Sequence, residues 1–134
     1  MIIANGTIVA VVDGAHARLF RNRGREPDID LVADHDPDLG AKNVGSGGRH
    51  RSSTANPDRS RLREDDFAAS VAGHLNAQAL AGRLERLVIV ADARTLGEMR
   101  RHFHRALSAR LVGVVEKDLT GLPPGAIEDA LRAA

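Results

Sequence analysis

The sequence predicts a three-layer α/β domain in which a mixed five-stranded sheet carries helices on its faces. Segments 7–12 and 87–91 are apolar and rich in β-branched residues, as is typical of central strands covered on both faces. A third such segment, at 111–115, follows a helical pattern, and strands that alternate with helices in this way usually lie parallel. The expected order of elements is β-β-β-α-β-α-β-α.

The first 33 residues predict a meander of three strands. A turn at Asp13-Gly14 ends the first apolar segment, and residues 17–21 then alternate apolar and polar, which predicts an antiparallel second strand. After another turn at 22–27, the alternating residues 29–33 predict a short third strand.

The second half of the chain predicts helices and parallel strands in alternation. Phe67, Val71 and Leu75 recur at helical spacing, which predicts a long amphipathic helix from about residue 62 to about 82. The remaining elements are a strand at 87–91, a helix over 95–103 that Thr95 is expected to cap, a strand at 111–115 and a terminal helix opened by Pro123-Pro124.

Composition restricts the class of protein. A chain of 134 residues fits one domain, expected over 1–134, and can bury its own core. The chain has no Cys, which excludes disulfides, thiolate catalysis and Cys-ligated zinc. It has neither Trp nor Tyr, so contacts with nucleic acid would go mainly to phosphates rather than to stacked bases. Without a signal peptide or an apolar run of about 18 residues, we expect a soluble, cytoplasmic protein with no membrane partner.

Charge is segregated along the chain, although the net charge is only +1. Residues 26–38 hold six acids and no Lys or Arg, whereas residues 41–63 hold six Lys or Arg and one acid. The basic block falls in a long Gly-rich loop expected at about 36–60. A long cationic loop on a rigid domain is typical of contact with an anionic partner. The alternative is that both blocks are solvated or pair with each other.

Acidic residues follow three of the predicted strands. Asp13, Asp92 and Asp118 stand at these strand ends, and Glu64 and Asp65 are expected to open the long helix. If the strand ends converge, carboxylates in a ribonuclease H-like topology could hold two divalent ions for phosphodiester cleavage.

The structural alternative is that these acids are ordinary turn and cap residues. Lys117, beside Asp118, would then pair with Asp92 or Asp13, whereas the functional alternative gives Lys117 a phosphate contact. The six histidines have no metal-ligand spacing, so we expect no metal site and no cofactor.

Five short segments spread over nearly the whole chain form a set of motifs. They are Val-Asp-Gly-Ala-His-Ala-Arg-Leu-Phe at 12–20, Phe-Ala at 67–68, Leu-Val-Ile-Val at 87–90, Arg-Thr-Leu-Gly-Glu at 94–98 and Lys-Asp-Leu-Thr-Gly-Leu-Pro at 117–123. Together they resemble the bacterial host attachment protein family, named for a requirement in attachment to host cells.

That family is similar to the middle domain of archaeal and eukaryotic peptide-chain release factors. In those proteins a Gly-Gly-Gln loop precedes a basic stretch and a long helix, and here Gly47-Gly48-Arg49 and Arg61-Leu62-Arg63-Glu64 stand in the same order. Arg49 replaces the glutamine that serves release chemistry, which argues against hydrolytic activity.

The resemblance and the basic loop together favour a protein that associates with RNA or the ribosome through residues 45–63. The residues expected to bind RNA are Gly47, Gly48, Arg49, Arg51, Arg59, Arg61 and Arg63. We expect the ribosome or tRNA as partner, binding that weakens with salt, and no enzymatic activity. Three alternatives stay open: a degenerate peptidyl-tRNA hydrolase, an interaction protein that supports cell attachment indirectly, and a divalent-metal-dependent nuclease. The sequence does not indicate an oligomeric state.

Overall fold

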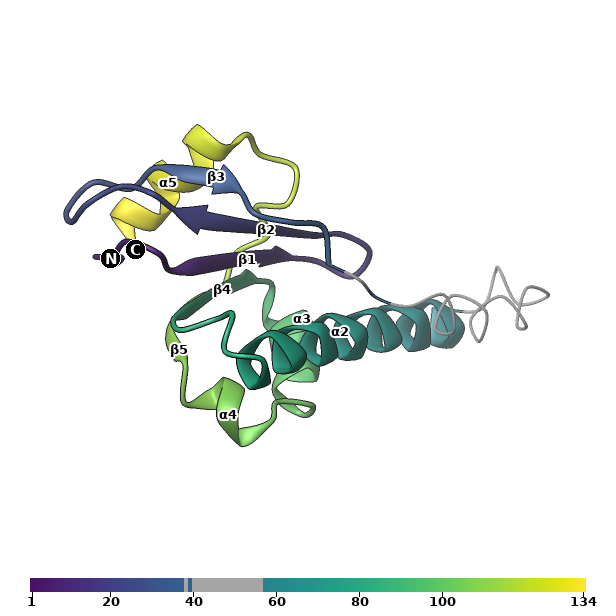
Figure 1. Cartoon of the computed structure of the whole chain (residues 1–134). Coiled ribbons are helices and arrows are strands. Elements are labelled where there is room, and N and C mark those ends of the chain that lie inside the picture. Colours follow the sequence, from purple (N-terminus) through teal and green to yellow (C-terminus); the bar gives the residue numbers. More distant parts are fainter. Residues whose placement is uncertain (38, 40–56) are drawn as a thin grey trace.

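The computed structural model describes residues 1–37, 39 and 57–134, and in that part it confirms the predicted three-layer α/β architecture (Figure 1). The strands are β1 (Ile8–Val12), β2 (Ala17–Asn22), β3 (Leu31–Ala33), β4 (Leu87–Ala91) and β5 (Leu111–Val115). The helices are α2 (Pro57–Leu80), α3 (Ala93–Arg100), α4 (Arg105–Ser108) and α5 (Pro124–Ala133). Among the described residues, no helix is long and apolar enough to cross a membrane.

The five strands form one mixed sheet in the order β3-β2-β1-β4-β5. β1 pairs antiparallel with β2 and parallel with β4, and β5 pairs parallel with β4. All residues of β1 and β4 are buried, which explains why these central strands are continuous apolar runs. In this register Val12 lies opposite Ala91 and Val90 opposite Val115, so β1, β4 and β5 end at one edge, here called the carboxyl edge.

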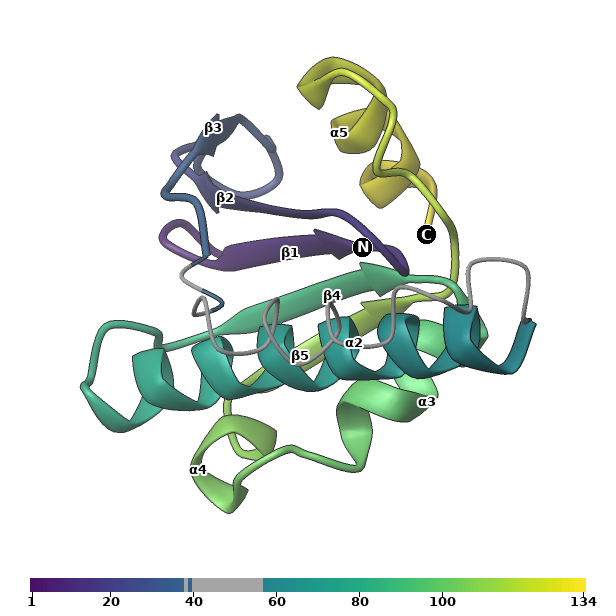
Figure 2. The ribbon, with the colours of Figure 1, turned by 90° about the vertical axis from the view of Figure 1, so that its right-hand side faces the viewer.

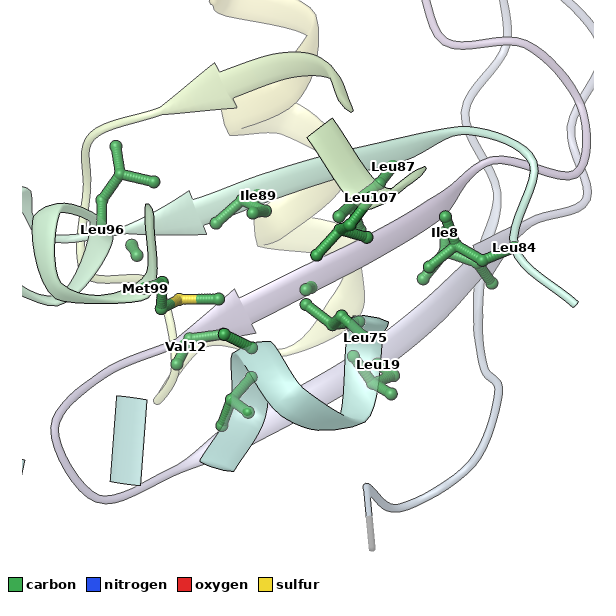
Figure 3. Packing of buried hydrophobic residues seen from close by; sticks show 14 of the residues in the cluster. Ile8, Val12, Leu19, Leu75, Leu84, Leu87, Ile89, Leu96, Met99 and Leu107 are labelled. Atoms are coloured by element: carbon green, nitrogen blue, oxygen red, sulfur yellow. The ribbon is translucent and has the colours of Figure 1, made fainter. Parts of the chain in front are cut away.

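Helices cover both faces of the sheet. Figure 2 shows α2, α3 and α4 on one face and α5 on the other. Alternate residues of β1 belong to the two cores: Ile8 and Val12 share a cluster with Leu75 of α2 (Figure 3), whereas Val9 and Val11 share a cluster with Ile127 of α5. The sheet is therefore the rigid platform that fixes the loops at its edges.

Helix α2 is much longer than the strands it covers. Its 24 residues span about 36 Å at about 1.5 Å per residue, whereas the five residues of β4 span about 17 Å. The first buried residue of α2 is Ala68, and none of residues 58–67 is buried. The first turns of α2 therefore project past the carboxyl edge, as Figure 1 shows. The projecting residues 57–63 are here called the α2 overhang.

Some predicted boundaries were wrong. Residues 57–60, expected in the loop, belong to α2, so Glu64 and Asp65 lie about two turns inside the helix rather than at its start. At the start of α3, Asp92 is the N-cap: it accepts a hydrogen bond from the Thr95 amide at 3.1 Å, and Thr95 itself is buried.

The helix expected over 95–103 is broken in two. Helix α3 ends at Arg100, and the side chain of His104 caps a short α4 that the sequence did not predict. The cause is tertiary, because Asn76 of α2 donates to the His102 carbonyl at 2.8 Å and accepts from the His104 amide at 2.8 Å. These two bonds keep residues 102–104 out of a helix, so His102 and His104 lie in the connection between α3 and α4.

Candidate functional site

A cleft of about 300 Å³ opens at the carboxyl edge of the sheet. It is lined by Asp13, Gly14, Ala15, His16, Glu64, Asp92, Arg94, Thr95 and Asp118. The turn after β1, the third turn of α2, the start of α3 and the segment after β5 all contribute. Asp13, Asp92 and Asp118 therefore do converge, because parallel strands present their carboxyl ends to one edge.

Asp13 is held by hydrogen bonds from two parts of the chain. Its Oδ1 accepts from the Ala15 amide at 2.8 Å and from the His16 amide at 2.5 Å, and the His16 ring lies 3.2 Å away. Its Oδ2 accepts from the Thr120 hydroxyl at 2.7 Å. Burial alone would raise the pKa of Asp13, but these donors outweigh it and lower the pKa below its ordinary value.

The segment after β5 is fastened to the β1–β2 hairpin at the same point. The Thr120 hydroxyl lies between Asp13 and Asp118, 2.8 Å from Asp118 Oδ1, and Arg18 donates to the Thr120 carbonyl at 3.1 Å. A second bond from Arg18 reaches the Leu122 carbonyl. The bonds that join Thr120 to Asp13 and to Arg18 were not predicted, since no local pattern marks bonds between residues more than 100 positions apart.

The other carboxylates of the cleft also have partners. Asp92 caps α3 and accepts from the Thr95 hydroxyl at 2.7 Å. Glu64 reaches over Gly14: a Cβ at Gly14 would lie 2.8 Å from Glu64 Oε2, so alanine there would have to displace this flexible, exposed side chain. Asp13 thus holds its own turn and the segment after β5, Asp92 caps α3, and Asp118 lies beside the Thr120 hydroxyl. This geometry favours a structural role for the three aspartates.

Within residues 1–37, 39 and 57–134, no group of three or more His, Asp or Glu side chains is placed to hold a metal ion. Lys117 is exposed, does not line the cleft, and forms no ion pair in the described part of the chain. The expected pairing of Lys117 with Asp92 or Asp13 was therefore wrong.

The predicted basic residues divide into two groups. Gly47, Gly48, Arg49 and Arg51 lie outside the described residues. Arg59, Arg61 and Arg63 lie on the α2 overhang, where Arg59 is half-buried and the other two are exposed. Among the residues that the structure describes, these three arginines have no ion-pair partner.

A histidine pair that the sequence did not predict joins the end of the meander to α2. The Nε2 atoms of His35 and His74 lie 2.7 Å apart, and His35 Nδ1 lies 2.5 Å from Asp34, which also accepts from Arg21 at 3.0 Å. Burial would raise the pKa of Asp34, but the bonds from His35 and Arg21 lower it. The chain of contacts positions the segment that leads out of the meander.

The fold and the basic start of its long helix are those expected of a release-factor-like domain. Comparison with protein families bears this out: the model of bacterial archaeo-eukaryotic release factor family 12 matches residues 6–131. The chain therefore belongs to that family. The match does not confirm the expected relation to host attachment proteins. No curated protein matches the chain.

Proposed function

We propose that the protein associates with RNA, and specifically with the ribosome, through the basic residues 45–63. The observation that carries the proposal is the α2 overhang, which presents Arg61 and Arg63 to solvent in a member of a release-factor family. Exposed arginines on a projecting helix end suit contacts with backbone phosphates, which position a protein on RNA without reading its sequence.

The two acidic residues directly after the α2 overhang, Glu64 and Asp65, contact residues other than its arginines. Asp65 lies one turn after Arg61, where helical spacing would pair the two. Instead Asp65 accepts from Arg94 of α3 at 2.8 Å, a bond that raises the pKa of Arg94. Glu64 is packed over Gly14. Within the part of the chain that the structure describes, neither Arg61 nor Arg63 forms an ion pair, so both can meet phosphates.

The test is co-sedimentation with ribosomes at about 50 and 200 mM salt, a range in which phosphate contacts weaken markedly. We compare wild type with Arg61/Arg63→Ala and with a charge-matched control, Arg23/Arg25→Ala, in the exposed turn after β2. We expect pelleting that falls with salt, and a loss on the order of tenfold in affinity at low salt for Arg61/Arg63→Ala only. Equal binding by both variants would refute the role of the overhang.

A wild-type protein that does not pellet at about 50 mM salt would refute the ribosome proposal itself. The interaction-protein alternative, including an indirect part in attachment, would then be the better hypothesis.

The family also favours a second candidate, a degenerate peptidyl-tRNA hydrolase. Gly47-Gly48-Arg49 precedes α2 as the release motif precedes its helix, with Arg49 where the motif has glutamine. A peptide-release assay on ribosomes separates the possibilities, because Arg49→Gln would restore hydrolysis if only this residue disables the site. Absence of release by wild type and by Arg49→Gln would refute the candidate.

A further inference from the structure

Two segments without acidic residues lie next to each other in the fold. Residues 67–84 and 99–115 contain no Asp or Glu, yet hold five arginines: Arg83, Arg100, Arg101, Arg105 and Arg110. The first segment is most of α2 with the turn after it, and the second runs from the end of α3 through α4 and β5. Since α2 packs against both α3 and α4, the two segments form one continuous acid-free region (Figure 2).

The positive charge of this region is largely unneutralised. Arg100 and Arg105 are exposed, Arg110 is half-buried, and none of the three forms an ion pair in the described part of the chain. Among the described residues, Arg101 alone of the five arginines has an acidic partner, Glu98 at 3.3 Å, and the Arg101 side chain is 75% exposed. A cluster of free guanidinium groups is an electrostatic surface for an anion-rich partner.

The backbone beneath these arginines is fixed. Asn76 of α2 holds both sides of the connection between α3 and α4 through its bonds to His102 and His104. The His104 ring accepts from the Ala106 amide at Nδ1, so in the neutral ring Nε2 carries the proton and offers a further donor. A preordered surface loses less conformational entropy when it binds than a flexible one.

We propose that this corner, formed by the end of α3, α4 and the entry to β5, is a second surface that contacts the phosphate backbone of structured RNA, through Arg100, Arg105 and Arg110. The inference deepens the proposed function and rests on it for the class of partner. The chain has no Trp or Tyr to anchor the corner in a membrane interface, and Phe103, the aromatic residue between α3 and α4, packs against the core rather than lying open for base stacking, which favours phosphate contacts to a duplex.

The corner and the α2 overhang lie at opposite edges of the sheet. Leu111 begins β5 opposite Leu87, the first residue of β4, so α4 and Arg110 lie at the amino edge, whereas the overhang projects past the carboxyl edge (Figure 1). Both belong to the layer that contains α2. One rigid RNA lying along this layer could therefore touch both surfaces, and two separated contacts on one ligand strengthen binding more than either alone.

The test measures binding of a fluorescent RNA duplex of about 20 base pairs by anisotropy between about 50 and 200 mM salt. The variant is Arg100/Arg105→Ala, the charge-matched control is again Arg23/Arg25→Ala, and Arg100/Arg105→Lys keeps the charge. We expect the alanine variant to lower the slope of log K against log salt by about 2, because each arginine removed leaves one phosphate unneutralised. The control should keep the slope, and the lysine variant should keep most of the affinity.

An unchanged affinity and slope for Arg100/Arg105→Ala would overturn the inference, as would no duplex binding by wild type at about 50 mM salt. Binding to vesicles of anionic phospholipid without binding to RNA would overturn it in favour of a membrane. Because the probe is a free duplex, its result is independent of the ribosome experiment: duplex binding through the corner without ribosome pelleting would refute the ribosome as partner and leave the RNA-binding corner in place. Thermal melting checks that each variant is folded.

Discussion

Replacing Thr120 with valine tests whether the carboxyl edge is held together by the bond between its hydroxyl and Asp13. Valine keeps the shape of threonine but removes the donor, and Asp13 loses one of its hydrogen bonds, of 2.7 Å. A hydrogen bond to a charged group contributes about 1.5–3 kcal/mol. Because the Asp13 side chain is 21% exposed and water can replace part of the interaction, we expect a loss of about 1.5 kcal/mol at pH 7.

Urea denaturation measures this loss. With an m-value of roughly 1.5 kcal/mol per M, the midpoint should fall by about 1 M, and the melting temperature by roughly 5 °C. Thr120→Ser is the matched control, since it keeps the hydroxyl and should stay near wild type.

The stability that Thr120→Val loses should depend on pH. The folded state lowers the pKa of Asp13 below its ordinary value of 3.8, so the stability from ionised Asp13 is fully present above that value and disappears as the pH falls through the folded-state pKa. Thr120→Val should therefore cost more at pH 7 than at the acid end of the transition. Valine and serine variants of equal stability, or a cost that does not vary with pH, would refute this account of the carboxyl edge.

Three other substitutions test the core and the cleft. Leu75→Ala should lower the free energy of unfolding by about 3 kcal/mol in urea denaturation, because the side chain is fully buried; a loss below ~1 kcal/mol would contradict this packing. Asp92→Ala should cost about 1 kcal/mol through loss of the α3 cap, and Asp92→Asn much less; equal losses would exclude a capping role. Gly14→Ala should cost little, because the added Cβ meets only the flexible end of the exposed Glu64 side chain, and Glu64→Ala should remove that cost; a loss above ~2 kcal/mol that persists in the double mutant would contradict this reasoning.

The sheet could be predicted because its signals are local. Burial on both faces requires an unbroken apolar run, so β1 and β4 stood out, and β4 and β5 have the bounds expected. The cap of α3 could not be decided in this way, since Asp92 and Thr95 are both good cap residues and only the end of β4 selects between them. The break between α3 and α4 depends on Asn76, a residue of another helix.

In the candidate site, too, local features could be predicted from the sequence and long-range contacts could not. Convergence of Asp13, Asp92 and Asp118 follows from strand direction alone and was predictable. The link through Thr120 and the contact between His35 and His74 join residues 107 and 39 positions apart, so no spacing rule reveals them. Roles for Gly47, Gly48, Arg49 and Arg51 stay predictions, because these residues lie outside the described part of the chain.

Charge separation in the folded domain restricts how RNA could approach it. The cleft at the carboxyl edge is lined by four carboxylates against one arginine, so phosphates would be repelled from its mouth. Arginines with no ion pair in the described part of the chain lie instead on the α2 overhang and on the corner at α4, both in the layer that contains α2. An RNA bound by these two surfaces would lie over α2 and leave the cleft uncovered. Hydrolytic chemistry would then have to come from the Gly-Gly-Arg segment rather than from the aspartates, which makes Arg49→Gln the decisive substitution for an enzymatic role.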